Sequence, residues 1–301
     1  MRKQRWSTGS ARLSTMELCG TGEAMLGGLK SVCWAVVAAL ALRALPARAA
    51  EPQLALDLPV DLGVTAFGFL LGGSAALFEA ELSHAPCAGL CDRSEIALAI
   101  DQSVVGNHSV AARNWSDGLI TGLTVAPLLL VAVDHGWSDA KSRDGLLTDT
   151  VLLAQTASVN LVLNTVVKHA VGRKRPLTYD SSWTEADRSS ADASLSFYSG
   201  HSATAFAMAT ATSRLFMIRH PDSDWVVPLW LGSEALAATT AVLRVEAGKH
   251  FWSDVAVGAL VGSAVGYLVP QLHLREQETG SVARVAPMVV DDGGALVFSL
   301  R

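Results

Sequence analysis

The sequence predicts an all-α protein, an antiparallel helical bundle with a short β-hairpin expected at its C-terminus. The first observation is a series of apolar segments of helical pattern, joined by short polar connections that favour antiparallel neighbours. The second is composition: 50% of the 301 residues are hydrophobic, 17% are charged, and the mean hydropathy is mildly positive, as in membrane or near-membrane proteins. A net charge of -5 without a basic stripe argues against a nucleic-acid partner.

The N-terminus is typical of an export signal. Lys30 precedes an apolar run over residues 32–42, and Ala47-Arg48-Ala49 follows as a small-x-small cleavage site. The run is short for a membrane span. We therefore expect a signal peptide over residues 25–49, with residues 1–24 as extra leader and Met25 as a better-placed start. An uncleaved anchor is the alternative.

Cleavage would leave two cysteines, Cys87 and Cys91, in the mature chain. In an oxidising compartment, this spacing favours a small local disulfide. A metal site would need more ligands than these two residues provide. The loop belongs to an N-terminal helical segment expected over residues 50–116.

The remaining elements follow from apolar periodicity and breaker residues. The segment 94–112 is expected to be an amphipathic helix with Asp101 and Arg113 facing outward. Residues 173–197 are polar and rich in Ser and Asp, and are expected to form a loop. The hairpin is expected within 286–300, around Asp291-Asp292-Gly293-Gly294. Further helices are expected at 60–78, 118–133, 146–167, 201–218, 226–242 and 254–269.

Three polar clusters interrupt this apolar sequence: Lys168 with Arg175-Pro176, then Ser199-Gly200-His201, then Arg244 with His250 and Asp254. Arg and Lys are the usual partners of a multiply charged phosphate-like group. The Ser-Gly-His cluster precedes a helical run, whose first backbone N–H groups are suited to an anion. His250 and Asp254 are four residues apart, so a carboxylate can fix the tautomer of an imidazole on the same helical face. The clusters predict an oxyanion site.

Antiparallel packing brings these clusters together. Lys168 ends one predicted helix, His201 begins the next, and Arg244 and Asp254 end and begin the following two. All four positions therefore fall at one end of the bundle. The polar loop 173–197 lies at the same end, as a lid.

The three clusters resemble the three-part signature of the type 2 phosphatidic acid phosphatase (PAP2) and vanadium haloperoxidase superfamily. The resemblance places the phosphatase core at residues 117–273 and leaves residues 274–301 as a tail or hairpin. Two positions depart from the family pattern: Tyr198 stands where Pro usually precedes Ser-Gly-His, and Leu243 stands where Ser often precedes the third-motif Arg. Neither position carries the chemistry, so we expect an effect on loop shape or specificity.

The resemblance also implies roles for individual residues. His250 would be the nucleophile that forms a phosphohistidine, and Asp254 would hold it in the attacking tautomer. His201 would protonate the leaving oxygen and then activate water. The phosphoryl oxygens would be bound by Lys168, Arg175, Ser199, the backbone of Gly200, and Arg244. No metal or other cofactor is required for this chemistry.

The expected function is a metal-independent phosphatase acting on phosphomonoester or pyrophosphate groups, of lipids such as phosphatidic acid or a polyprenyl pyrophosphate. A soluble periplasmic acid phosphatase of broad specificity is the nearest alternative. A vanadium haloperoxidase, with His250 ligating vanadate, and a non-catalytic phosphate-binding envelope protein are two others. The sequence names neither the lipid nor the oligomeric state.

The location of the protein follows less directly. Arg214, Glu234 and the polar residues of 146–167 weaken a spanning assignment for their helices. If the signal is cleaved and every later helix crosses, the catalytic end lies inside the cell. An outward-facing site requires that 60–78 does not cross, that the leader stays uncleaved, or that the protein is soluble. We expect export to a bacterial envelope, with a periplasm-facing site in the inner membrane favoured over a soluble periplasmic protein.

Overall fold

The structure is a computed structural model that describes residues 53–78, 87, 89–136, 142–275, 284–288 and 295–299. The chain divides into two compact units, residues 52–277 and residues 1–51 with 278–301. The predicted leader and signal peptide lie outside the described residues.

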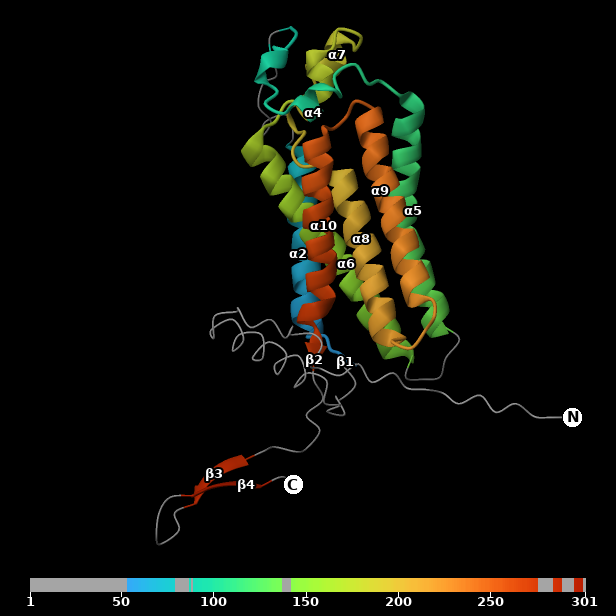
Figure 1. The fold of residues 1–301 in the computed structure, drawn as a ribbon, viewed down its shortest axis with the longest axis vertical. Helices are drawn as coiled ribbons and strands as arrows, with labels where there is room; N and C mark the ends of the chain where they lie inside the picture. The colour runs from blue at the N-terminus through green and yellow to red at the C-terminus, as the bar shows by residue number, and fades with distance from the viewer. Residues whose placement is uncertain are drawn as a thin grey trace, which may run out of the picture. The chain divides into compact units, whose positions relative to one another are not determined.

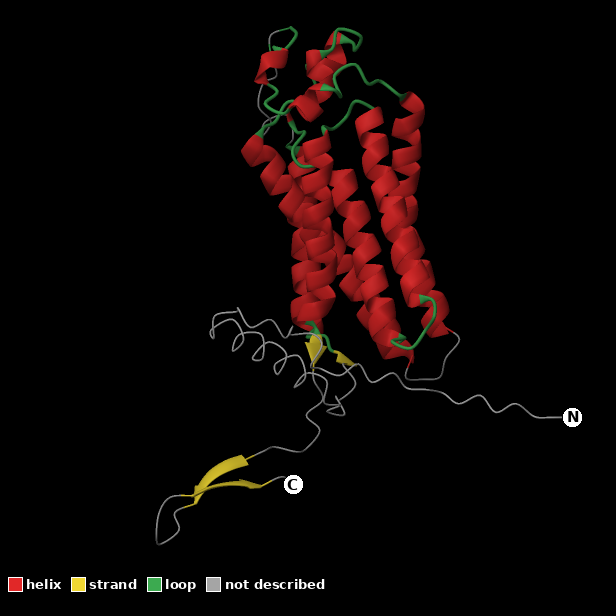
Figure 2. Ribbon diagram, in the orientation of Figure 1, coloured by secondary structure: helices red, strands yellow, loops and turns green. Residues whose placement is uncertain are grey.

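The larger unit is a bundle of six long helices (Figures 1 and 2). Their bounds are α2 Leu58–Leu77, α5 Val110–Gly136, α6 Ser142–Val171, α8 Gly200–Arg219, α9 Val226–Glu246 and α10 Trp252–Leu272. The prediction of an all-α bundle is confirmed. Most helices extend a few residues beyond their predicted ends, because periodicity locates the apolar core of a helix better than its polar termini.

Helix α8 occupies the centre of the bundle. It contacts α5, α6, α9 and α10, while α2 packs on α6. Its alanines from Ala203 to Ala211 at alternate positions are almost fully buried, which allows close approach of neighbours from several sides. The helix that begins with the Ser-Gly-His cluster is therefore enclosed by apolar helices.

Glycines of α10 determine how closely this helix approaches α8. Gly258, Gly262 and Gly266 are spaced by four residues, so they lie along one face. A Cβ built on them would lie 2.7, 2.1 and 2.4 Å from backbone carbonyl oxygens of α8 or of Ser199, which precedes it. The absence of side chains thus lets two backbones meet, as in small-residue contacts of membrane helices.

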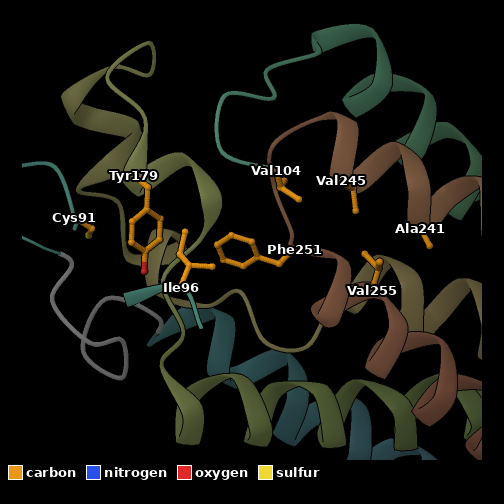
Figure 3. Packing of buried hydrophobic residues seen from close by; sticks show 8 residues of the cluster. All are labelled: Cys91, Ile96, Val104, Tyr179, Ala241, Val245, Phe251 and Val255. Carbon is orange, nitrogen blue, oxygen red and sulfur yellow. The ribbon is translucent and has the colours of Figure 1, made fainter. Parts of the chain in front are cut away.

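Short elements cover one end of the bundle. They are the 3₁₀ turns η1 Arg93–Glu95, η2 Pro176–Tyr179 and η3 Ala191–Ser194, with α4 Ala99–Gln102 and α7 Glu185–Arg188. A hydrophobic cluster joins them to the helices: Tyr179, Ile96 and Val104 lie around Phe251 at the start of α10 (Figure 3). This packing holds the chain before α10 against the N-terminal segment.

The predicted amphipathic helix over residues 94–112 is wrong. The chain forms η1 and α4 there and begins α5 at Val110. Asp101 faces inward, is fully buried, and accepts hydrogen bonds from Ser253 and Arg173. Periodicity predicts that a charged side chain such as Asp101 faces outward. Its burial is tolerated here because the carboxylate is paired with Arg173 and hydrogen-bonded to Ser253.

Two small antiparallel sheets complete the described chain. Strand β1 Gln53–Leu54 pairs with β2 Leu274–Arg275, which ties the start of α2 to the end of α10. In the second unit, β3 Arg284–Met288 pairs with β4 Ala295–Ser299. This pair corresponds to the predicted C-terminal hairpin, whose turn lies outside the described residues.

The bundle has the surface of a helical membrane protein. Among the described residues, five segments are long and apolar enough to cross a membrane: Leu58–Ala75, Val110–Gly136, Arg143–Tyr179, Val226–Glu246 and Trp252–Leu272. Large apolar side chains such as Phe67, Leu129 and Leu260 are more than 60% exposed on their outer faces. Apolar exposure on this scale is typical of a lipid-facing surface.

The polar residues that weakened this assignment face other helices. Arg214 donates to Gln271, Glu234 accepts from Thr210, and Asp149 in α6 is paired with Arg219. Charged groups inside a membrane bundle are tolerated when they pair in this way. The pairing therefore favours the membrane alternative over the soluble one.

Candidate active site

The three polar clusters meet at the end of the bundle that carries α4 and α7 (Figure 1). Lys168 lies in the last turn of α6, Ser199-Gly200-His201 caps and begins α8, and Arg244 lies in the last turn of α9. His250 precedes α10, and Asp254 lies in its first turn. Two contacts join the clusters directly: Arg175 to His250 at 3.1 Å, and the Ser199 N–H to the Asp254 carbonyl at 3.1 Å.

His250 is held in one tautomer by its two neighbours. Arg175 has no acceptor atom in its guanidinium, so its N–H donates to His250 Nε2, which carries the lone pair. His250 Nδ1 then carries the proton and donates to the Ser196 carbonyl at 2.9 Å. The nitrogen with nucleophilic character, Nε2, is therefore on the side of the arginine.

The surroundings of His250 keep its ring neutral. The side chain is 1% exposed. Burial lowers its pKa well below the ordinary value, and the charges of Arg175, Lys168 and Arg244 lower it further. A neutral imidazole with an available lone pair is the form that can attack an electrophile.

The turn before His250 requires a glycine. Gly248 has φ 65°, in the left-handed region, and a Cβ there would meet the Asn107 carbonyl oxygen at 2.0 Å. Asn107 also donates to the Val245 carbonyl. The chain can therefore leave α9 tightly and return His250 to the site.

Asp254 supports His250 through charge and through the backbone. Its Oδ2 lies 3.7 Å from His250 Nδ1, accepts from Ser196 Oγ at 2.5 Å and accepts from the Phe251 N–H at 2.9 Å. The hydrogen-bond partner of Nδ1 is thus the Ser196 carbonyl, and Asp254 holds both the residue that supplies this carbonyl and the start of α10. The structure therefore places Asp254 one residue further from the ring than the predicted direct contact with His250.

Arg173 lies between two buried carboxylates. It donates to Asp254 Oδ1 at 2.5 Å and to Asp101 Oδ2 at 2.9 Å, and its guanidinium stacks 4.4 Å from the Phe251 ring centroid. Its contacts place it in support of the carboxylate behind His250.

A second carboxylate, Asp117, was missed as a site residue. It accepts from Arg244 at 3.0 Å and contacts His201 Nε2 at 2.8 Å, while Arg244 also donates to Ser116 Oγ at 3.2 Å. The predicted helix began one residue after Asp117, although the observed α5 begins at Val110. An acidic residue in the first turns of a helix that starts at the catalytic end was the available signal.

Ser199 and Gly200 form the start of α8. Ser199 Oγ accepts from the Ser202 N–H as an N-cap, and the first N–H groups of the helix face the site end. A Cβ at Gly200 would lie 2.7 Å from Asn164 Oδ1 and 3.7 Å from Lys168 Nζ. Asn164 donates to the Tyr198 carbonyl at 2.8 Å, just before α8. Gly200 therefore keeps the backbone beside the lysine accessible.

The polar loop supplies further contacts around Arg175. Asp192 accepts from Arg175 through its side chain at 2.5 Å and through its carbonyl at 2.8 Å. Desolvation raises the pKa of Asp192, but the charges of Arg175 and Lys168 outweigh it and lower that pKa to about 2. Trp183 is buried and stacks under Lys249, with 4.7 Å from Nζ to the ring centroid, so it anchors the lid.

Two other predictions concern the cysteine pair and a metal or other cofactor. Cys87 and Cys91 are joined by a disulfide with Cα atoms 5.3 Å apart, as their spacing predicts. Across the described helices and loops, no group of three or more His, Cys, Asp or Glu side chains is arranged to hold a metal ion. That the reaction needs no cofactor stays a prediction.

The geometry defines a class of site. A neutral, buried histidine lies beside an arginine, with a second histidine, a lysine and a second arginine at the same end of a helical membrane bundle. Such a set suits a tetrahedral oxyanion that is attacked at its central atom.

Comparison with known proteins agrees with this class. Residues 150–278 match the model of the PAP2 superfamily, which confirms the resemblance drawn from the three motifs. A probable diacylglycerol pyrophosphate phosphatase 1 of Schizosaccharomyces pombe is 29% identical over 154 residues, which cover 43% of this chain and 52% of that protein. Phospholipid phosphatase 1 of Rattus norvegicus is 28% identical over 135 residues, which cover 38% of this chain and 48% of that protein.

The chain thus spans about half the length of these curated relatives. The crystal structure of a transmembrane PAP2 type phosphatidylglycerolphosphate phosphatase from Bacillus subtilis aligns with a TM-score of 0.41 and 21% identity. The alignment covers 70% of this chain and 94% of that one.

Proposed function

We propose that the protein is a metal-independent phosphatase that hydrolyses phosphomonoester or pyrophosphate groups of lipids through a phosphohistidine. The observation that carries the proposal is the state of His250. Its ring is buried and neutral, with Nδ1–H bound to Ser196 and the Nε2 lone pair directed at Arg175. These are the features of an activated nucleophile placed where an anion would bind.

In the first half of the reaction, His250 Nε2 attacks phosphorus and the bond from phosphorus to the leaving oxygen breaks. Burial and the charge of Arg244 lower the pKa of His201 in the free site to about 4, so the negative charge of the bound phosphate must raise this pKa for His201 to carry a second proton. Protonated His201 then donates a proton to the leaving oxygen, and the leaving group departs as an alcohol or a phosphate. The Ser196 carbonyl and Asp254 stabilise the positive charge that develops on the His250 ring. The product on the enzyme is a phosphohistidine.

In the second half, water attacks phosphorus and the P–N bond breaks. His201, now neutral, takes a proton from this water, and phosphate leaves while His250 returns to its neutral form. Asp117 orients His201 through the 2.8 Å contact with Nε2. General acid–base catalysis by a positioned histidine typically contributes a factor of about 10²–10⁴.

Charge on the transferring group is balanced by Lys168, Arg175 and Arg244. The fork of an arginine binds two phosphoryl oxygens at once, and a lysine adds a point charge. Phosphoryl transfer depends mainly on positioning and charge stabilisation, so this set supplies what the reaction needs. In the free site Arg175 is occupied by His250 and Asp192, and a bound phosphate would compete for its N–H groups.

Lipid substrates are favoured by the surroundings of the site. The helices that carry it have lipid-facing surfaces, and two relatives are named as phosphatases of a diacylglycerol pyrophosphate and of phospholipids. A broad-specificity phosphatase for soluble esters is the second candidate, and the same site chemistry would serve it. A haloperoxidase that binds vanadate at His250 and a non-catalytic phosphate-binding protein are weaker alternatives.

We further propose that the site faces the periplasm. Helix α2 packs along α6 within the bundle and qualifies as a span, so the alternative in which residues 60–78 do not cross loses support. An outward-facing site then places the start of α2 on the cytoplasmic side, which requires that the leader is not translocated. Membrane-impermeant maleimide on intact cells should label Glu185→Cys in α7 and spare Asp222→Cys at the opposite end, in a background lacking Cys19 and Cys33. The reverse pattern would overturn this orientation.

The activity is tested by phosphate release from phosphatidic acid and from a water-soluble phosphomonoester, both in EDTA. We expect release that resists EDTA and disappears in His250→Ala, while His220→Ala at the opposite end keeps wild-type activity. The ratio of the two substrates separates a lipid phosphatase from a soluble-ester phosphatase. No release from either substrate by folded protein would refute the proposal for these esters, and halide oxidation that appears with added vanadate would favour the haloperoxidase alternative.

A further inference from the structure

A large apolar cavity lies between the helices that carry the active site. It has a volume of about 550 Å³ and is lined by residues of α5, α8 and α9. This volume is within the range of roughly 300–1,000 Å³ that is usual for small-molecule sites. The same three helices carry Asp117, His201 and Arg244 at the catalytic end.

The position of the cavity along the helices sets its distance from the site. In α9 the lining runs from Leu236 to Pro228, which places it roughly 12–24 Å from Arg244 at 1.5 Å per residue. In α5 the lining begins at Leu123, roughly 9 Å along the axis from Asp117. The cavity therefore starts about 10 Å below the catalytic end and extends away from it.

The lining is suited to hydrocarbon. Two of its members have hydroxyl groups, Thr212 and Ser233, and both hydroxyls are engaged within the protein. Thr212 donates to the Met208 carbonyl at 2.6 Å, and Ser233 contacts Ser213 Oγ at 3.0 Å and the Trp230 carbonyl at 3.1 Å. No lining side chain carries a charge. A polar ligand would thus find little to replace its hydration.

A path along α5 from the site to the cavity would pass two exposed glycines. Gly118 and Gly122 of α5 lie between Asp117 and Leu123, both are exposed, and a Cβ on either would meet nothing within 4 Å. Inside this path, Ala205 and Ala237 pack with Leu123 and close the direct way through the bundle. A chain leaving the site would therefore run along the outer surface of α5 and enter the cavity from the lipid side.

We propose that this cavity holds the hydrocarbon chain of the phosphorylated lipid whose phosphate occupies the active site. The inference rests on the proposed function and adds a substrate class: phosphates of one long, unbranched or isoprenoid chain that spans about 10 Å along α5 before it enters the cavity. Short esters bind at the phosphate site without reaching it. The cavity therefore selects substrates whose hydrocarbon chain is long enough to extend beyond this distance.

The test compares two monoalkyl phosphates, butyl phosphate and hexadecyl phosphate, which share the reacting group and differ in chain length. Gly232→Phe fills the cavity, since a Cβ at Gly232 meets nothing within 4 Å. Gly73→Phe in α2 is the matched control, because its Cβ is equally unobstructed and it does not line the cavity. Ala126→Phe, from the α5 wall, is a second filling variant if Gly232→Phe does not fold.

We expect Gly232→Phe to lower kcat/KM for hexadecyl phosphate about tenfold or more, as for a ligand forced out of an apolar pocket. Its kcat/KM for butyl phosphate should stay within about twofold of wild type, and Gly73→Phe should change neither. Unchanged hexadecyl phosphate hydrolysis in both filling variants, or equal losses for both esters, would overturn the inference while leaving the phosphatase intact. Failure of wild type to hydrolyse either ester would instead refute the proposed function.

Discussion

The contact between α10 and α8 makes the activity sensitive to a single methyl group far from phosphate. In Gly262→Ala, the new Cβ would lie 2.1 Å from the Ala203 carbonyl oxygen. Real Cβ contacts are essentially never below 3.0 Å, so the two backbones must separate by about 0.9 Å. A carbonyl within a helix cannot rotate aside as a side chain can.

The consequence for catalysis follows from what each helix carries. Helix α8 holds Ser199 and His201 and α10 holds Asp254, and the Ser199 N–H bonds to the Asp254 carbonyl at 3.1 Å. A displacement near 1 Å of one catalytic element costs about 10²-fold in rate. We therefore expect Gly262→Ala to lower kcat on a soluble phosphomonoester by about that factor.

Stability should fall at the same time, because inserting a methyl group into a close-packed contact costs about 1–3 kcal/mol. The thermal midpoint in detergent should therefore fall by about 2–12 °C. Gly232→Ala is the control: nothing lies within 4 Å of its Cβ, and alanine is favoured over glycine in a helix by about 1 kcal/mol. Wild-type activity and midpoint in Gly262→Ala would show that the helices adjust without cost, and would refute the reasoning.

Three further predictions concern the site. Burial and the nearby cations lower the pKa of His250 below 6.5, and the nucleophile must be neutral, so the acidic limb of the pH profile of kcat/KM should lie below pH 6.5. Arg175→Gln removes a cation and should move this limb to higher pH, whereas an acidic limb above pH 6.5 in wild type would contradict the prediction. Asp117→Asn removes the charge that orients His201 and should lower kcat about 10²-fold in steady-state assays, whereas a change in KM alone would assign Asp117 to binding. Asp254→Asn should lower kcat by less than the ~10⁴-fold seen where a carboxylate itself sets the tautomer, because the Ser196 carbonyl sets it here. A loss of ~10⁴-fold in kcat would show that Asp254 acts on His250 directly.

The long helices, and the end of the bundle at which the polar clusters gather, could be predicted from the sequence. Apolar periodicity located six long helices, and the alternation of cluster positions between helix ends and starts placed Lys168, His201, Arg244 and Asp254 together. These features depend on local spacing and on antiparallel packing, which short connections favour. Polar residues in the middle of helices weakened the membrane assignment, because the sequence does not show that such residues pair between helices, as Arg214 does with Gln271.

The contacts that orient the site residues could not be predicted from the sequence. The tautomer of His250 depends on the Ser196 carbonyl, 54 residues away, and backbone carbonyls leave no trace in residue identity. Asp101 and Asp117 join the site from segments whose helical boundaries differ from the prediction: Asp101 was expected to face outward, and Asp117 was left outside its helix. Contacts of this kind form where distant segments pack, and their energies depend on burial and on geometry that only the folded chain defines.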